Sequence, residues 1–251
     1  MYKYFLKQKL TIISDSKYIL SKNLSYMKDC LYPSFEKIPI VHATVDFNSF
    51  LSISRKLNIN NSKEDSVILG SIGRLNWAKG YDLLIKALSK IKEEHPNFSL
   101  KIAGDGPYRN MLEGMIDRYC LRKNIFILGE LHYNDIPKFL LSIDLYIQPS
   151  ISEGSPITLK EAMASSLPIL ASTAGGIPEI IEHNKTGILF ESGNTVELEK
   201  GLKKIINMDN SLRTEMGLRA RKNSLKNFDI KKTAQTLNNI YNVVLKNNYP
   251  I

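Results

Sequence analysis

The sequence predicts an α/β domain with a doubly wound parallel sheet, and three observations support this fold class. From about residue 66 onward, short apolar segments alternate with longer amphipathic ones, and the alternation repeats five times. Glycine-containing turns follow several of the apolar segments. The 251 residues are 43% hydrophobic and 24% charged, which is typical of a folded globular chain. Repeated strand–helix–strand units form right-handed crossovers and build a parallel sheet with helices on both faces.

The hydrophobic pattern defines each element in turn. The predicted strands are Val67–Ile72, Phe98–Ala103, Asn124–Leu128, Leu145–Gln148, Ile169–Ala171 and Gly187–Phe190. The predicted helices between them are Tyr81–Glu94, Pro107–Cys120, Asp135–Ser142, Ile157–Ser166 and Ile177–Glu182. Ligands bind such sheets at the carboxyl ends of the strands, so a functional site is expected in the loops that follow the strands.

Different patterns flank this unit. Before it we expect a strand, a helix, a second strand and a polar linker at Leu10–Ser14, Lys17–Lys28, Ile38–His42 and Arg55–Ser66. After residue 193 we expect three helices at Thr195–Asn207, Ser211–Lys226 and Asp229–Leu245. The last has apolar residues at alternating spacings of four and three, so it should pack on another surface. The pattern divides the chain into residues 1–65, 66–228 and 229–251.

The chain carries a formal net charge of +9, and the basic excess lies near its end. Residues 200–251 contain eleven Lys and Arg against three acidic residues. This excess is compatible with an anionic partner such as a membrane surface, and equally with solvated lysine-rich helix faces. No nucleic-acid-binding motif accompanies the charge, so we expect no nucleic-acid partner.

Cysteine content and hydropathy indicate the compartment. Cys30 and Cys120 cannot form a disulfide scaffold, and their spacing fits no zinc site. No segment approaches the roughly 18 apolar residues of a membrane span. The first residues have lysines but no apolar core of a signal peptide. We therefore expect a cytoplasmic protein.

The turns after the first three strands favour a phosphate-containing ligand. Arg74 and Lys79 lie between the first strand and its helix, where a guanidinium, an ammonium and free helix amides suit a pyrophosphate. Taken alone, these two residues are more often solvated basic side chains of a loop. Gly104-Asp105-Gly106-Pro107 and Gly129-Glu130-Leu131 follow the next two strands. They allow close backbone approach to a ligand, but each is equally compatible with an ordinary turn. None matches the dinucleotide fingerprint G-x-G-x-x-G, which argues against a nicotinamide dehydrogenase.

The turn after the fourth strand contains two carboxylates eight positions apart. Glu153 lies in the loop of SEGSPITLKEAMA, and Glu161 lies in the following helix. Carboxylates accept hydrogen bonds from ligand hydroxyls, and the free amides near Thr158 and Leu159 at the helix start favour an anion. Hydroxyls and phosphate together describe a sugar nucleotide.

Five segments, taken in order, resemble the retaining glycosyltransferase family 4, the "group 1" family of the two-domain GT-B fold. They are GRL…KG at 73–80, GDGP at 104–107, EGSPITLKEAMA at 153–164, GGIPEII at 175–181 and HNKTGILF at 183–190. The resemblance implies a Rossmann-like donor-binding domain at 66–228, a crossover helix at 229–251, and at 1–65 the β-α-β end and hinge of an N-terminal acceptor domain. About 150 further residues of that domain precede this point in complete members.

The resemblance also implies roles for individual residues. Arg74 and Lys79 would bind the donor diphosphate, Glu153 would lie near the donor sugar and Glu161 would bind the ribose. The remaining nucleotide contacts would come from Gly73, Gly104, Gly129, Glu130, Leu131, Gly154, Thr158 and Leu159. Ser166 and Asn184 stand where the family usually has Gly, and of the two Asn tolerates a left-handed backbone better.

Two functions are compatible with these features. The first is a retaining hexosyltransferase that moves a sugar from a UDP-sugar or GDP-sugar to a hydroxyl of a glycan or lipid-linked acceptor in polysaccharide or cell-envelope synthesis, without a metal ion. The second is a donor-binding half that transfers little alone and pairs with itself or with a chain supplying the missing domain. In either case the basic C-terminal region would favour peripheral contact with the inner face of the membrane.

Overall fold

The computed structural model describes residues 15–26, 41, 44–46 and 66–248. Helix α2, Lys17–Tyr26, lies within the expected Lys17–Lys28. The strand expected at Leu10–Ser14 lies outside the described residues. Of the strand expected at Ile38–His42, only Val41 is described, and it belongs to no strand. The expected linker Arg55–Ser66 is likewise outside them except for Ser66.

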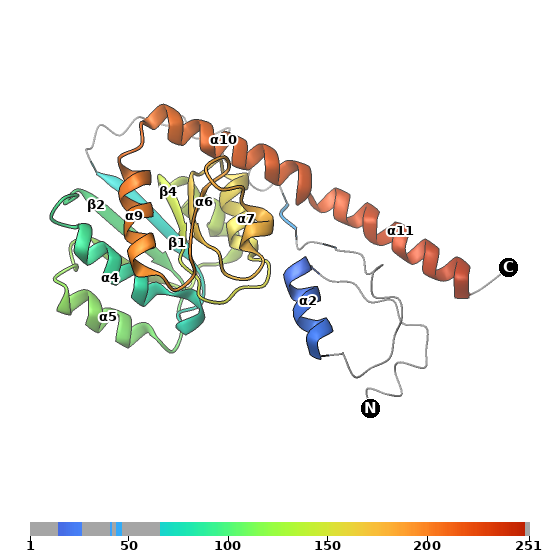
Figure 1. Cartoon of the computed structure of the whole chain (residues 1–251), viewed down its shortest axis with the longest axis horizontal. Helices are drawn as coiled ribbons and strands as arrows, with labels where there is room; N and C mark the ends of the chain where they lie inside the picture. The colour runs from blue at the N-terminus through green and yellow to red at the C-terminus, as the bar shows by residue number, and fades with distance from the viewer. Residues whose placement is uncertain (1–14, 27–40, 42–43, 47–65, 249–251) are drawn as a thin grey trace.

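Six parallel strands form one sheet, which confirms the predicted fold class (Figure 1). The strands are β1 Val67–Ile72, β2 Phe98–Ala103, β3 Ile125–Gly129, β4 Leu145–Gln148, β5 Ile169–Ser172 and β6 Ile188–Phe190. Their order is β3-β2-β1-β4-β5-β6, with Leu69 of β1 opposite both Leu100 of β2 and Leu145 of β4. The chain therefore winds outward in one direction from β1 and in the other direction from β4.

The helices occupy the predicted stretches with small changes at their ends. They are η2 Trp77–Lys79, α4 Tyr81–Ile91, α5 Arg109–Arg118, η3 Tyr133–Asp135, α6 Ile136–Leu141, α7 Ile157–Ala164, α8 Ile177–Ile180, α9 Thr195–Ile206, α10 Asn210–Asn227 and α11 Ile230–Asn248. The helix expected at Ile177–Glu182 ends at Ile180 because Ile181 turns to an extended backbone conformation. The helix expected from Pro107 begins at Arg109.

Two apolar clusters cover the sheet. One joins β1 and β2 to α4, α5 and α9, and its fully buried members include Leu69, Ile85 and Leu202. The other joins β4 and β5 to α6, α7, α8 and α10, and includes Tyr146 and Met163. All four residues of β4 are buried, as expected for a strand with helices on both faces. The rigid sheet fixes the positions at which the loops leave its carboxyl edge.

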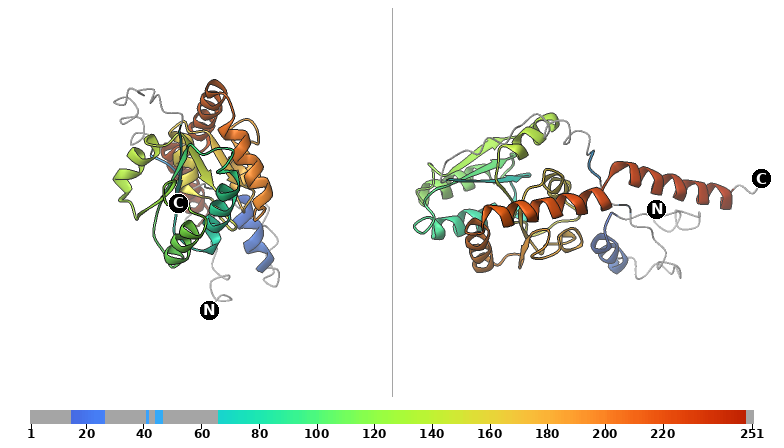
Figure 2. Two further views of the ribbon diagram at one scale, coloured as in Figure 1. Left: turned by 90° about the vertical axis from the view of Figure 1, so that its left-hand side faces the viewer. Right: turned by 90° about the horizontal axis from the view of Figure 1, so that it is seen from above.

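The last two helices, α10 and α11, differ in how they relate to the rest of the domain. Helix α10 packs on α7, whereas α11 extends away from the domain (Figures 1 and 2). Val45 pairs with Asp229 at the junction of these helices, and its amide donates to the Phe228 carbonyl at 3.1 Å. Ile230 and Tyr241 of α11 are 45% and 62% exposed, so part of the predicted apolar stripe is uncovered. No described helix has both the length and the apolar character needed to cross a membrane.

Two non-glycine residues adopt the left-handed conformation at the positions where the resemblance led us to expect glycine. Ser166 has φ 61° and Asn184 has φ 62°. Ser166 ends the turn after α7, and its carbonyl lies so close to α10 that a Cβ on Gly217 would come within 1.9 Å of it. Ser166 cannot relax by moving its backbone, because α10 occupies that space.

We therefore expect Ser166→Gly to raise the free energy of unfolding by about 0.5–1 kcal/mol, since relief of the left-handed strain exceeds the entropy cost of glycine. The matched control is Ser165→Gly, one residue earlier at φ −81°, which should lower the free energy of unfolding by a similar amount. Urea denaturation of both variants measures these changes. Equal effects of the two substitutions would contradict the strain at Ser166.

Candidate functional site

The candidate site lies where the strand order reverses. The loops after β1 and β4 leave neighbouring strands and continue in opposite directions, and this is where a doubly wound sheet opens a crevice for a ligand. Backbone hydrogen bonds from Ile151 and Ser152 to the Ala78 carbonyl join the two loops, at 2.7 and 3.1 Å. Gly80 has φ 63°, and an added Cβ would lie 2.1 Å from the Pro149 carbonyl oxygen. The two loops thus form one closely packed unit.

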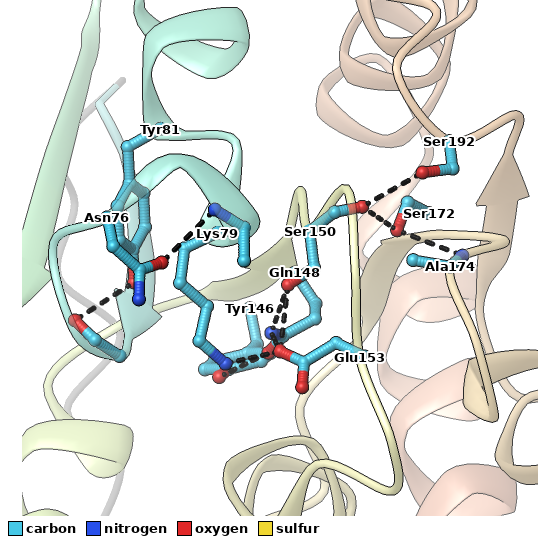
Figure 3. A network of polar contacts seen from close by, with 12 residues as sticks. Asn76, Lys79, Tyr81, Tyr146, Gln148, Ser150, Glu153, Ser172, Ala174 and Ser192 are labelled. Atoms are coloured by element: carbon cyan, nitrogen blue, oxygen red, sulfur yellow. Dashed lines mark hydrogen bonds and ion pairs between the residues drawn. The ribbon is translucent and has the colours of Figure 1, made fainter. Parts of the chain in front are cut away.

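An ion pair between Lys79 and Glu153 connects the two loops at this point (Figure 3). Both side chains are largely buried, at 20% and 11% exposed. The same carboxylate oxygen of Glu153, Oε1, also accepts from Gln148 Nε2 at 3.0 Å and from Ser150 Oγ at 2.9 Å. Three donors therefore fix the position of one carboxylate oxygen.

A wider set of hydrogen bonds holds these donors in place (Figure 3). The Tyr146 hydroxyl donates to Gln148 Oε1 at 2.9 Å, and Gln148 Nε2 also donates to Ser150 Oγ at 2.8 Å. The Ser172 hydroxyl of β5 donates to the Ser150 carbonyl at 2.6 Å. Because Tyr146 is buried, the pKa of its phenol lies well above 10. This network of buried and partly buried groups holds the Glu153 carboxylate in one orientation.

Glu161 lies on α7 and is only 2% exposed. Its Oε2 has no hydrogen-bond partner among the described residues. Burial raises the pKa of this carboxyl to about 7. Its charge in turn contributes to the raised pKa of Tyr133 and Tyr146, which places the carboxylate near both phenols. A buried carboxylate oxygen without a protein partner is free to accept a hydrogen bond from a ligand group.

The ends of β1, β2 and β3 approach one another through their glycines. The Gly104 amide donates to the Gly129 carbonyl at 2.7 Å, and a Cβ on Gly104 would lie 2.0 Å from the Gly73 carbonyl oxygen. Beyond Gly129, Glu130 is exposed and Leu131 is half-buried against the core. Backbone groups, rather than side chains, form this part of the carboxyl edge.

The structure brings some of the predicted residues together and leaves others apart. Helix α7 starts after Pro156, which provides no side-chain cap, so the amides of Thr158 and Leu159 lie in a first turn that lacks intrahelical partners. Arg74 is exposed, and its guanidinium forms no ion pair or hydrogen bond with the described residues. Gly154 packs against Ile19 of α2, and a Cβ added to Gly154 would lie 3.2 Å from the Ile19 side chain. The ligand roles assigned to these residues stay predictions.

Four residues of the network, Tyr146, Gln148, Ser150 and Ser172, were missed in the sequence. Gln148 ends the fourth strand and Ser150 follows two positions later, in LYIQPS, and both are buried. The available signal was the placement of polar residues at the carboxyl end of an otherwise apolar, buried strand. In the described part of the chain, no three His, Cys, Asp or Glu side chains are arranged to hold a metal ion.

Comparison with known proteins identifies the family. Residues 52–223 match the family model described as glycosyl transferases group 1. Protein CapJ of Staphylococcus aureus is 30% identical over 94% of this chain, and a putative colanic acid biosynthesis glycosyltransferase of Salmonella typhimurium, WcaL, is 28% identical over 77%. This chain covers 58% and 48% of those relatives, and so about half of their length.

A solved structure supports the same assignment at the level of the fold. The protein HepE of Anabaena, solved in complex with UDP and glucose, superposes with a TM-score of 0.75 at 22% identity. The superposition covers 92% of this chain and 62% of HepE. The matching sheet, the reversal of strand order and the family model agree. The chain belongs to the group 1 glycosyltransferases.

Proposed function

We propose that this chain supplies the donor site of a retaining glycosyltransferase that uses a nucleoside-diphosphate sugar. The observation that carries the proposal is the meeting of Lys79 and Glu153 where the strand order reverses, which sets a cation for phosphate beside an acceptor for sugar hydroxyls. The partnerless Oε2 of Glu161 adds a second buried acceptor on the next helix. HepE, which has a related fold, was solved with UDP and glucose.

Each part of the donor is assigned to a part of the site. Arg74 and Lys79 hold the diphosphate with the amides of Thr158 and Leu159 at the start of α7. Glu161 accepts from the ribose hydroxyls, and Glu153 accepts from a hydroxyl of the sugar. Backbone at Gly129, Glu130 and Leu131 meets the base, and the backbone of Gly73, Gly104 and Gly154 supplies the remaining nucleotide contacts. The leaving diphosphate is neutralised by side chains and helix amides, without a metal ion in the scheme.

In the proposed reaction the bond between the anomeric carbon and the diphosphate oxygen breaks, and the acceptor hydroxyl oxygen bonds to that carbon on the same face. The acceptor proton leaves with the nucleoside diphosphate. The chain contributes positioning and charge neutralisation, which lower the barrier without a protein-bound intermediate. The acceptor is a glycan or a lipid-linked acceptor in polysaccharide or cell-envelope synthesis, in line with the description of WcaL as a putative colanic acid biosynthesis glycosyltransferase.

A second candidate is a donor-binding half that needs another polypeptide for transfer. The exposed Ile230 and Tyr241 of α11 favour it, because uncovered apolar surface promotes association. Sedimentation and a donor-hydrolysis assay on the purified chain distinguish the candidates. A monomer with turnover of roughly 1 per second or faster supports the autonomous enzyme. A self-associated chain, or one that binds donor without transfer, supports the second candidate.

Salt-sensitive binding of the purified chain to anionic vesicles tests the expected peripheral contact with a membrane.

Calorimetric titration with UDP, GDP, ADP and their glucose derivatives tests donor binding directly. In such titrations we expect Arg74→Ala and Lys79→Ala each to weaken nucleoside-diphosphate binding by about 1.5–3 kcal/mol, the range for charged hydrogen bonds. The control is Arg122→Ala, whose guanidinium pairs with Asp117 before β3. It should leave the affinity unchanged. Normal affinity in both Arg74→Ala and Lys79→Ala would remove their diphosphate role.

Substitutions of Glu161 and Glu153 should have different effects on the affinities for UDP and for UDP-glucose. Glu161→Gln should weaken UDP and UDP-glucose alike, because the proposed contact is to the ribose that both contain. Glu153→Gln should weaken only UDP-glucose, since the lost acceptor faces the sugar while Lys79 is released toward the diphosphate. The same calorimetric comparison gives both ratios. Identical behaviour of the two variants across both ligands would show that this division of roles is wrong.

The affinity for UDP-glucose should also depend on pH through Glu161. With a pKa of about 7, this carboxyl is mostly protonated at lower pH and loses acceptor capacity for ribose hydroxyls. UDP-glucose has no group of its own that titrates in this range, so its affinity should rise about tenfold from about pH 6 to about pH 8, following the ionised fraction. Glu161→Gln should show a flat profile, and a pH dependence retained in that variant would assign it to another group.

A further inference from the structure

A fully buried lysine lies beside the candidate site and takes no part in the proposed donor contacts. Lys160 precedes Glu161 on α7 and has no exposed surface. Burial lowers the pKa of its ammonium to about 8, and the charges of Asp15 and Glu179 partly oppose this decrease. A lysine is buried in this way only when its ammonium has partners. The identity of those partners indicates what it does.

Four chain segments contribute to the surroundings of Lys160. Its Nζ donates to Ser155 Oγ at 2.7 Å, in the loop between β4 and α7 that contains Glu153, which we call the donor loop. It also lies 4.9 Å from the centre of the Phe228 ring, at the end of α10. The negative charges of Asp15, just before α2, and of Glu179 on α8 also act on this ammonium and raise its pKa. Lys160 thus connects the donor loop with the start of α2.

The start of α2 is held by Glu179, one of the two acidic groups whose charge acts on Lys160. The Glu179 carboxylate accepts from the amides of Lys17 and Tyr18 at 3.0 and 2.8 Å, and so caps α2 from 161 residues further along the chain. Ser16 Oγ accepts from the Ile19 amide at 3.1 Å, which adds a local cap. The position of α2 therefore depends on Glu179.

The capped end of α2 also packs directly on the donor loop. A Cβ on Gly154 would lie 3.2 Å from Ile19, and one on Gly175 would lie 3.2 Å from Tyr18. The same Cβ on Gly175 would lie 1.8 Å from the Glu153 carbonyl oxygen, so α2, the loop after β5 and the donor loop form one tightly packed layer. A shift of the donor loop would move against α2.

We propose that Lys160 is a positioning residue that couples the donor loop to α2, so that the nucleotide sugar and the docked helix stabilise each other. The proposal rests on the proposed donor site for the ligand, and on the contacts of Ser155, Lys160 and Glu179 for the coupling. A donor held by Glu153 orders the loop and Ser155, which fixes the Lys160 ammonium against the group that caps α2. Linkage requires the reverse effect of equal size, a tighter donor site when α2 is docked.

Amide hydrogen exchange of Lys17 and Tyr18 in the full chain, with and without saturating UDP-glucose, tests this coupling. In the unaltered chain the ligand should slow exchange by about fivefold or more, the lower end of typical allosteric coupling. Ser155→Ala should leave exchange without ligand unchanged and abolish the slowing by ligand. Lys160→Met should speed exchange without ligand by about fivefold to tenfold, as expected for a weakened helix cap, and also abolish the ligand effect.

Two further variants complete the experiment. Glu179→Gln changes an exposed side chain. It should speed the exchange of the Lys17 and Tyr18 amides and weaken the binding of UDP-glucose by about fivefold. This variant replaces Lys160→Met in the experiment if Lys160→Met does not fold. Lys138→Met, which removes an exposed ion pair with Asp135, is the control and should behave as the unaltered chain. Slowing by ligand that persists in Ser155→Ala would overturn the proposal. If the unaltered chain binds no UDP-glucose, the proposed donor site fails and the coupling with it, while fast exchange in Lys160→Met would still show that Lys160 holds α2.

Discussion

The parallel pairing of β1 with β4 is the constraint on which the site depends. It brings together two loops whose strands are separated by 72 residues between Ile72 and Leu145, and it sends their helices to opposite sides. Lys79 and Glu153 meet only because these strands are neighbours. The hydrogen bonds to the Ala78 carbonyl and the close fit of Gly80 on Pro149 then lock the loops together. Any sheet order that separated β1 from β4 would leave each of these residues in an isolated turn.

Much of the fold could be predicted because it follows from the local pattern of apolar residues and turn residues along the sequence. The bounds of β1, β2 and β4 agree with the predicted segments. Strand β4 is buried along its whole length, whereas β2 alternates apolar buried residues with the half-buried Ser99 and Lys101, and both patterns are typical of strands. Ser166 and Asn184 were expected at positions that favour glycine, and both have a left-handed backbone. The end of α8 was placed two residues too late, because Ile181 and Glu182 continue the helical pattern while the chain already turns toward β6.

The parts that could not be predicted depend on contacts between distant segments. The sequence located Lys79 and Glu153 in ligand-facing loops but did not show that they pair, which depends on strand order. Lys160 has the sequence context of an exposed helix residue. Its burial comes from Phe228, 68 positions later, and from the residues before α2. Likewise, Gln148 and Ser150 become significant only once Glu153 folds back onto the end of β4.

The arrangement around Glu153 has a consequence for the stereochemistry of recognition. Three donors engage Oε1, so this carboxylate cannot rotate freely, and its other oxygen keeps one direction. An acceptor with a fixed direction suits a hydroxyl in only one orientation on a sugar ring, axial or equatorial, because hydrogen bonds weaken steeply with angle. Discrimination between epimers would then depend on the rigidity of Tyr146, Gln148 and Ser150 behind the carboxylate, rather than on the shape of the crevice.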